Sequence, residues 1–211
     1  MGVPERPARP ENGRRDLMDI AIDCFARYGY QATSIDRIAK AAGLTKGAIY
    51  YHFKDKEQLL FEAVKNRVSQ FERRIIAEIE TIHDAAAALR RVGELCLEHA
   101  TKSNHRRLIV TLMVEALDTN ARLSAQFREM MRRFRAFLRG IIEVGQRQGL
   151  FRADVSAITA AGVYAGAVMG AEIEFYQDPD QVDLGEHLRT FLEQYLTWLA
   201  APVRRARRTS R

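Results

Sequence analysis

The feature that most constrains this chain is a long stretch without proline, from residue 11 to residue 178. Proline removes a backbone N–H and clashes with the preceding turn, so its absence leaves long helices free to form. Apolar residues recur through this stretch every three or four positions, and no segment alternates apolar and polar residues as a half-buried strand would. With 47% apolar residues the chain can bury a substantial core. We therefore predict an all-α fold.

Capping and stopping residues divide the proline-free stretch into helices. We expect helices over residues 14–28, 34–42, 45–53, from 56 to beyond 75, 84–101, 104–118, 121–148, 155–177 and 183–200. The expected start signals are Ser34, Thr45, Asp55, Asp84, either Asn120 or Ala121, Ser156 and Asp183. The expected stop signals are Gly29, Gly43, Gly149 and Asp178-Pro179-Asp180.

The two short helices carry the clearest functional pattern. Ala39, Gly43 and Ile49 stand at the separations of a helix-turn-helix: a small residue at the helix crossing, a glycine in the turn and a branched residue on the second helix. Such a unit places its second helix in the major groove of DNA. The alternative is a packing hairpin, in which Tyr50, Tyr51 and His52 would be half-buried.

The segment from Gly43 to Leu60, GLTKGAIYYHFKDKEQLL, resembles the DNA-binding signature of the tetracycline-repressor (TetR) family. The specific match covers roughly residues 14–62, and the rest of the chain agrees in length and helical character. The resemblance implies a homodimeric regulator that binds double-stranded DNA at a near-palindromic operator and has no cofactor.

The outward residues of this segment are the predicted DNA contacts. We expect Lys46 and Tyr50 to read base edges, with Gly47 allowing close approach. The predicted phosphate contacts are Ser34, Thr45, Tyr51, His52 and Lys56.

The domain organisation follows from these segments. Residues 1–13 are expected to form a flexible basic arm, residues 14–55 the DNA-binding domain, residues 56–202 a helical effector-binding and dimerisation domain, and residues 203–211 a basic tail containing five arginines. Cys24 and Cys96 lack metal-type spacing and are expected to be buried thiols.

A ligand pocket is predicted in the middle of the second domain. Flexible Met and flat Phe side chains on successive helices suit an adaptable apolar pocket, although they also suit a plain core. The predicted lining is Cys96, Leu112, Met113, Glu115, Phe127, Met130, Met131 and Phe134. Glu115 and Glu172 are the acidic residues expected to point inward. A carboxylate there would favour a cationic ligand or accept a hydrogen bond from a neutral one.

A dimer interface is predicted on the last two helices. Alanines and glycines make residues 155–177 a thin helix that permits close approach, and an apolar stripe follows along residues 183–200. The predicted contacts are Ala161, Ala165, Leu188, Phe191, Leu192 and Tyr195. The alternative is that both stripes pack within the chain.

Catalytic and metal-binding patterns are not found. Glu80 and His83 have the Glu-x-x-His spacing of carboxylate-bridged metal bundles, but such sites need two copies of this motif. No phosphate-binding glycine loop, nucleophile elbow, membrane span or secretory leader is visible. We therefore expect a cytoplasmic, non-enzymatic repressor that a small hydrophobic ligand releases from DNA. An all-α enzyme or a helical adaptor with a packing hairpin is the alternative.

Overall fold

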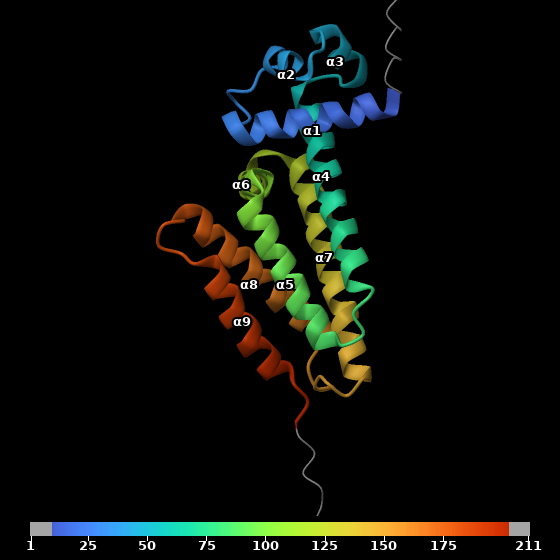
Figure 1. Cartoon of the computed structure of the whole chain (residues 1–211), viewed down its shortest axis with the longest axis vertical. Helices are drawn as coiled ribbons and strands as arrows, with labels where there is room; N and C mark the ends of the chain where they lie inside the picture. Colours follow the sequence, from blue (N-terminus) through green and yellow to red (C-terminus); the bar gives the residue numbers. More distant parts are fainter. Residues whose placement is uncertain (1–9, 203–211) are drawn as a thin grey trace, which may run out of the picture. The chain divides into compact units, whose positions relative to one another are not determined.

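The computed structural model describes residues 10–202, and the regular structure of this part is helical (Figure 1). The helices are α1 (Pro10–Tyr28), α2 (Ile35–Ala42), α3 (Lys46–His52), α4 (Lys56–Ile79), α5 (Ala85–Lys102), α6 (Asn104–Thr119), α7 (Ala121–Arg147), α8 (Ala157–Gln177) and α9 (Leu184–Leu199). The predicted all-α fold is confirmed.

Side-chain caps begin most of these helices at the predicted residues. Asp55 Oδ1 accepts the Gln58 N–H at 2.7 Å at the start of α4, and Asp84 Oδ1 accepts the Ala87 N–H at 2.7 Å before α5. Asn120, Ser156 and Asp183 cap α7, α8 and α9 in the same way. Helix α1 differs, because it begins at Pro10 and not at Arg14. Proline is favourable in a first helical turn, where its missing N–H would have had no partner.

The backbone separates into two compact units. The first contains the chain up to Arg74 together with Ala100–Phe127, and the second contains Ile75–His99 and the chain from Arg128. Helices α4, α5 and α7 each have residues in both units.

In the first unit, α1 packs against α2 and also against α6, and α2 packs against α3 (Figure 1). Leu17, Phe25, Ile38, Ile49 and Phe53 are almost fully buried. The loop into α2 is fixed by Thr33, whose buried hydroxyl lies 2.7 Å from the Gly29 carbonyl and 3.2 Å from the Cys24 carbonyl. Cys24 and Cys96 are both buried free thiols, as predicted.

Polar contacts hold the first part of α4 to α1 and the loop that follows it. The guanidinium of Arg14 lies 3.7 Å from Glu62, and Asn66 donates to Asp19 at 3.3 Å. Lys56 Nζ donates to the Tyr30 carbonyl at 3.0 Å and lies 4.3 Å from the centre of the Tyr30 ring. The start of α4 is therefore fixed to the helices that surround α3.

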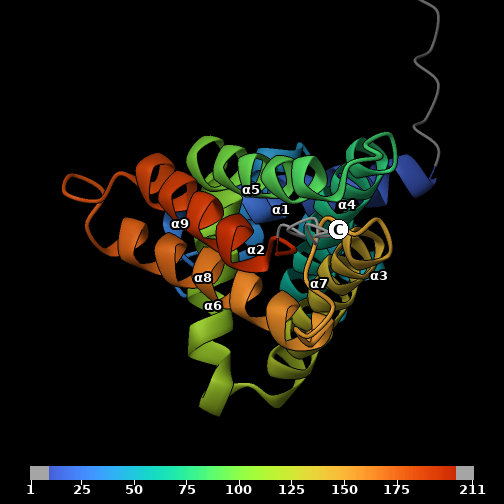
Figure 2. The same cartoon turned by 90° about the horizontal axis from the view of Figure 1, so that it is seen from below.

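In the second unit, α8 and α9 lie side by side (Figure 2). Tyr164 is fully buried and its hydroxyl donates to the Leu89 carbonyl at 2.8 Å, while the Tyr195 hydroxyl donates to the Ala160 carbonyl at 2.9 Å. Burial raises the pKa of both phenols, so both remain neutral donors. These two bonds join α8 to its neighbours.

The last turn of α4 is held by Arg91 of α5. Its Nε lies 3.0 Å from Glu78 Oε2, and its Nη1 lies 3.0 Å from Glu94 and 3.1 Å from Glu98. These hydrogen bonds raise the pKa of the guanidinium, which is charged at all relevant pH values.

Two glycines of α7 give a stability prediction. A Cβ added at Gly145 would lie 2.1 Å from the ring of Phe151, whereas one added at Gly140 meets no atom within 4 Å. Because overpacking a buried ring costs about 1–3 kcal/mol, Gly145→Ala should lower the free energy of unfolding by that amount. Gly140→Ala, the matched control, should raise it by about 0.5–1 kcal/mol through helix propensity. Denaturant titrations compare the two, and equal stabilities would contradict the close contact.

Candidate nucleic-acid interface

Helix α3 separates an inward face from an outward one. Ile49 and the following Phe53 are 0% and 1% exposed, whereas Tyr50 is 47% and Tyr51 86% exposed. The alternative of a packing hairpin requires Tyr50, Tyr51 and His52 all to be half-buried, and of these three only His52 is. Both tyrosines are instead exposed to solvent on a short, anchored helix, where they are available to contact a partner.

The turn between α2 and α3 has the conformation that the sequence predicts. Gly43 adopts a left-handed backbone with φ 64°, and its N–H and that of Leu44 bond to carbonyls at the end of α2. Glycine adopts this conformation without the steric cost that a Cβ would bring. The turn thereby fixes how α3 follows α2.

Ser34 and Thr45 are the caps of α2 and α3. Ser34 Oγ accepts the Arg37 N–H at 3.1 Å, and Thr45 Oγ1 accepts the Ala48 N–H at 3.2 Å. A hydroxyl that accepts a capping bond still has its own proton to donate. Both exposed hydroxyls are therefore free to donate to a phosphate oxygen, and their phosphate contacts stay a prediction.

Lys46 is held by an acid on the neighbouring helix. Its Nζ lies 3.0 Å from Asp36 Oδ2, and both side chains are more than half exposed. The hydrogen bond to Asp36 and the charge of this carboxylate raise the pKa of Lys46, so the ammonium is charged. An exposed pair of this kind contributes little to stability, so a DNA contact can replace it at small cost.

The remaining predicted contacts lie close to α3. Gly47 is exposed, and half-buried His52 packs edge-on against Tyr51 with 5.0 Å between ring centres. Lys56 is half-buried, and its contact with the Tyr30 carbonyl leaves two of its three ammonium protons for other acceptors.

Helix α2 carries two exposed cations that are not among the predicted DNA contacts. Arg37 lies with its guanidinium 4.3 Å from the centre of the Tyr28 ring, and Lys40 is exposed one turn later. The sequence could have predicted both as DNA contacts, because residues three positions apart lie on one side of a helix and this side faces away from the buried Ile38. The predicted arm residues 1–9 and tail residues 203–211 lie outside the described part of the chain.

The predicted pocket residues fall on both compact units. Cys96, Leu112, Phe127 and Met130 are buried, and Met113, Met131 and Phe134 are half-buried. Glu115 corrects the expectation that it points inward: it is exposed, because α6 buries Ile109, Leu112 and Ala116 on another face. Glu172 is fully buried, as expected. A shared cavity lined by the other residues stays a prediction.

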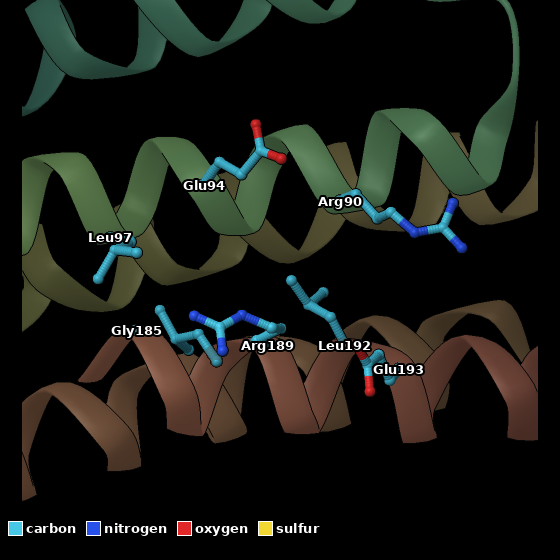
Figure 3. Close-up of a pocket in the computed structure, with 8 residues that line it drawn as sticks. Arg90, Glu94, Leu97, Gly185, Arg189, Leu192 and Glu193 are labelled. Carbon is cyan, nitrogen blue, oxygen red and sulfur yellow. The ribbon is translucent and has the colours of Figure 1, made fainter. Parts of the chain in front are cut away.

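Most of the predicted interface residues pack inside their own chain. Ala161, Ala165, Leu188 and Tyr195 are at most 4% exposed. Leu192 points toward α5 (Figure 3), and its Cδ1 would lie 2.6 Å from a Cβ added at Gly93. Phe191 is half-buried, 5.5 Å from the Tyr164 ring. Intrachain packing therefore accounts for the burial of Ala161, Ala165, Leu188 and Tyr195, and the dimer interface on α8 and α9 stays a prediction.

The exposed apolar residues of these two helices are different ones. Ile158 and Val163 of α8 are 63% and 49% exposed, and Trp198 of α9 is 42% exposed. Cβ atoms added at Gly162, Gly166 and Gly170 would meet no atom within 4 Å. We call Ile158, Gly162, Val163, Gly166, Gly170 and Trp198 the outer α8–α9 face.

Two absences hold for residues 10–202. None of the helices described there combines the length and apolar character needed to cross a membrane. Within the same range, no three or more His, Cys, Asp or Glu side chains gather where they could hold a metal ion.

Two family models match the chain. Residues 17–63 match the model described as bacterial regulatory proteins, tetR family, and residues 86–167 match the tetracyclin repressor-like C-terminal domain. The first match contains α2, the turn and α3, the helices that carry the predicted DNA contacts.

Curated proteins and solved structures are similar over most of the chain. The HTH-type transcriptional repressor KstR2 of Rhodococcus jostii (strain RHA1) is 27% identical, covering 91% of this chain and 94% of that protein. A protein described as "Probable acrEF/envCD operon repressor" from Escherichia coli (strain K12) is 30% identical, covering 74% of each. A transcriptional regulator from Saccharomonospora viridis, solved in complex with choline, has a TM-score of 0.78 and 26% identity, covering 90% of this chain and 97% of that chain.

The two lysines at the interface should respond differently to substitution. Lys46→Gln should cost about 1–3 kcal/mol on the preferred DNA sequence and little on scrambled DNA, because it removes a base contact. Lys56→Gln keeps a donor for the Tyr30 carbonyl but removes a charge, so it should weaken both complexes alike and reduce the salt slope by about one unit.

Binding titrations at several salt concentrations, on DNA selected by the protein itself, measure both effects. Lys65→Gln, an exposed lysine further along α4, is the control. A changed base preference for Lys56→Gln with an unchanged salt slope would contradict the assigned role.

Proposed function

Since this chain belongs to the TetR family and is a DNA-binding transcriptional regulator, not an enzyme, we propose that it is a repressor. It binds a near-palindromic operator as a homodimer and leaves it when a small, largely apolar ligand binds. The observation that carries the DNA-binding role is the exposure of Tyr50 and Tyr51 on a helix anchored by Ile49. Relatives from Rhodococcus jostii and Escherichia coli are named repressors, which supports repression and not activation of transcription.

The dimer requirement follows from the size of the DNA-reading element. Helix α3 has seven residues and can contact only a few base pairs. Two copies related by a two-fold axis would reach major-groove faces about 34–36 Å apart and read a near-palindrome. A second chain thus supplies the specificity that one α3 lacks.

The outer α8–α9 face is the surface we propose for the second chain. It presents the exposed side chains of Ile158, Val163 and Trp198, and it includes a strip of three α8 glycines at which an added Cβ would meet no atom of residues 10–202 within 4 Å. A second α8 can approach such a strip closely. Isologous contact of this face with its own copy gives the required two-fold symmetry.

The ligand response depends on the continuity of α4. This helix starts at Lys56, directly after α3, and ends at Ile79, beside the Glu78–Arg91 ion pair. Its first turns are bound to α1 and Tyr30, so a displacement of its last turns would move α3 with it. A ligand that favours one position of α4 then favours one separation of the two α3 helices.

A cationic group on the ligand is the second possibility. Glu172 is fully buried on α8, and a buried carboxylate favours a positive charge nearby. The Saccharomonospora viridis regulator, 26% identical, was solved with choline. A quaternary ammonium on an apolar body would combine both requirements.

A charge on the outer α8–α9 face should separate the dimer. Val163→Asp places an unpaired carboxylate in a dry contact, so it should yield monomers that bind the operator weakly. Ile76→Asp, an exposed apolar residue of α4, is the control and should remain dimeric. Leu188→Asp should instead lower the stability of the chain itself, because Leu188 is 2% exposed. Sedimentation velocity separates these cases, and a dimeric Val163→Asp protein would rule out this face.

Ligand and operator should each weaken the other's binding by the same factor. A compound that raises the melting temperature, found among choline-like cations and neutral apolar molecules, should lower operator affinity by about 5–150-fold, a coupling of about 1–3 kcal/mol. Fluorescence anisotropy of the protein–operator complex measures it. Glu172→Gln should weaken a cationic ligand more than a neutral one. Ligand binding with unchanged operator affinity would refute the coupling.

A further inference from the structure

A polar hollow of about 490 Å³ lies in the first compact unit, apart from the α3 contacts. It is lined by Asp23, Ala26 and Arg27 of α1, Arg67 of α4, Lys102 of α5, Ser103 between helices, and Asn104 and His105 of α6. Figure 1 shows α1 between α6 and the pair α2 and α3, so the α6 side of α1 is not the side that carries the DNA contacts.

The charge of this hollow is positive. Arg27, Arg67 and Lys102 contribute three cations, and none of them forms an ion pair with a residue in the described part of the chain. Asp23 is the only acid of the lining, and its Oδ1 is hydrogen-bonded to His105 Nε2. Three unpaired cations around one concave surface attract an anion.

One hydrogen-bond donor in the hollow, the Ser103 hydroxyl, also lacks a partner within residues 10–202. Ser103 is the residue before α6, yet its hydroxyl makes no capping bond, unlike the caps of α2, α3, α8 and α9. Ser103 Oγ and His105 Nδ1 are shielded from solvent and have no hydrogen-bond partner within residues 10–202. A sixteen-residue helix therefore begins here with its first N–H groups and its cap hydroxyl available.

We propose that this hollow binds a phosphorylated small molecule. The arginine forks of Arg27 and Arg67 match the geometry of phosphate oxygens, Lys102 adds a point charge, and Ser103 with the start of α6 supplies neutral donors. The hollow is larger than a phosphate ion, so room remains for the group that carries the phosphate.

This site goes beyond the proposed apolar ligand and has its own consequence. The bound anion would touch α1, α4 and α6 at once, and α1 packs directly on α2 of the DNA-binding module. It would therefore fix the position of the module relative to α6 independently of any ligand elsewhere in the chain. Operator affinity then responds to a second, charged effector.

Calorimetric titration of sodium pyrophosphate into the full chain without DNA, at constant ionic strength, tests the proposal. The wild type should bind, and Arg67→Gln and Lys102→Gln should each weaken binding about tenfold. Lys102 is exposed, so its variant retains the fold. Lys65→Gln on α4 and Lys46→Gln on the DNA face are matched controls and should bind as the wild type does.

The outcomes separate clearly. Equal loss in the Lys46→Gln control would place the anion on the DNA face, and unchanged affinity in both hollow variants would remove the site; either result overturns the proposal. Citrate provides a carboxylate of similar charge, and tighter binding of citrate than of pyrophosphate would overturn the phosphate assignment. Because no operator is present, the result does not depend on the proposed repressor function.

Discussion

The attachment of α4 to α1 is the constraint on which the rest of this structure depends. Helix α4 begins four residues after α3 ends, and three polar contacts join it to α1 and Tyr30 before it has completed four turns. Lys56 makes the contact nearest to α3, with its ammonium against both the carbonyl and the ring of Tyr30. These contacts add to the burial of Ile49 and Phe53 in holding α3, because a seven-residue helix is too short to hold its shape alone.

This rigidity explains how so small a module can present bulky side chains to a partner. Ile49 and Phe53 are buried beneath α3, so Tyr50 and Tyr51 remain outside. The Lys46–Asp36 pair orients the Lys46 ammonium but binds it weakly, because an exposed ion pair contributes little to stability. A DNA oxygen can therefore replace the Asp36 carboxylate. The surface is therefore pre-arranged for DNA, and little of the binding free energy is lost in ordering it.

Local chemistry was enough to predict the helices, the caps and the turn. Asp55, Asp84 and Asp183 act on N–H groups three residues away, and Gly43 acts within one turn, so the sequence contains everything these features need. An apolar stripe is different. It predicts that one face of a helix is buried, but it does not predict whether that face packs within the chain or against a second chain. Leu188 and Tyr195 belong to the stripe of α9, and both are buried by residues of the same chain. The polar hollow could not be predicted at all, because Arg27, Arg67 and Lys102 come from three different helices.

The glycines of α8 bear on the proposed dimer interface. A glycine in a helix interior costs about 0.5–1 kcal/mol relative to alanine, and α8 has three at positions where a Cβ would meet no atom within 4 Å. Within residues 10–202, no neighbouring atom lies where a Cβ at Gly162, Gly166 or Gly170 would stand, so no close contact there compensates this cost. A second helix that approaches the bare backbone closely would compensate it, through contacts that alanine side chains would block. Gly166→Ala should therefore stabilise an isolated chain and weaken its dimer, a pair of opposite effects that concentration-dependent melting temperatures can separate.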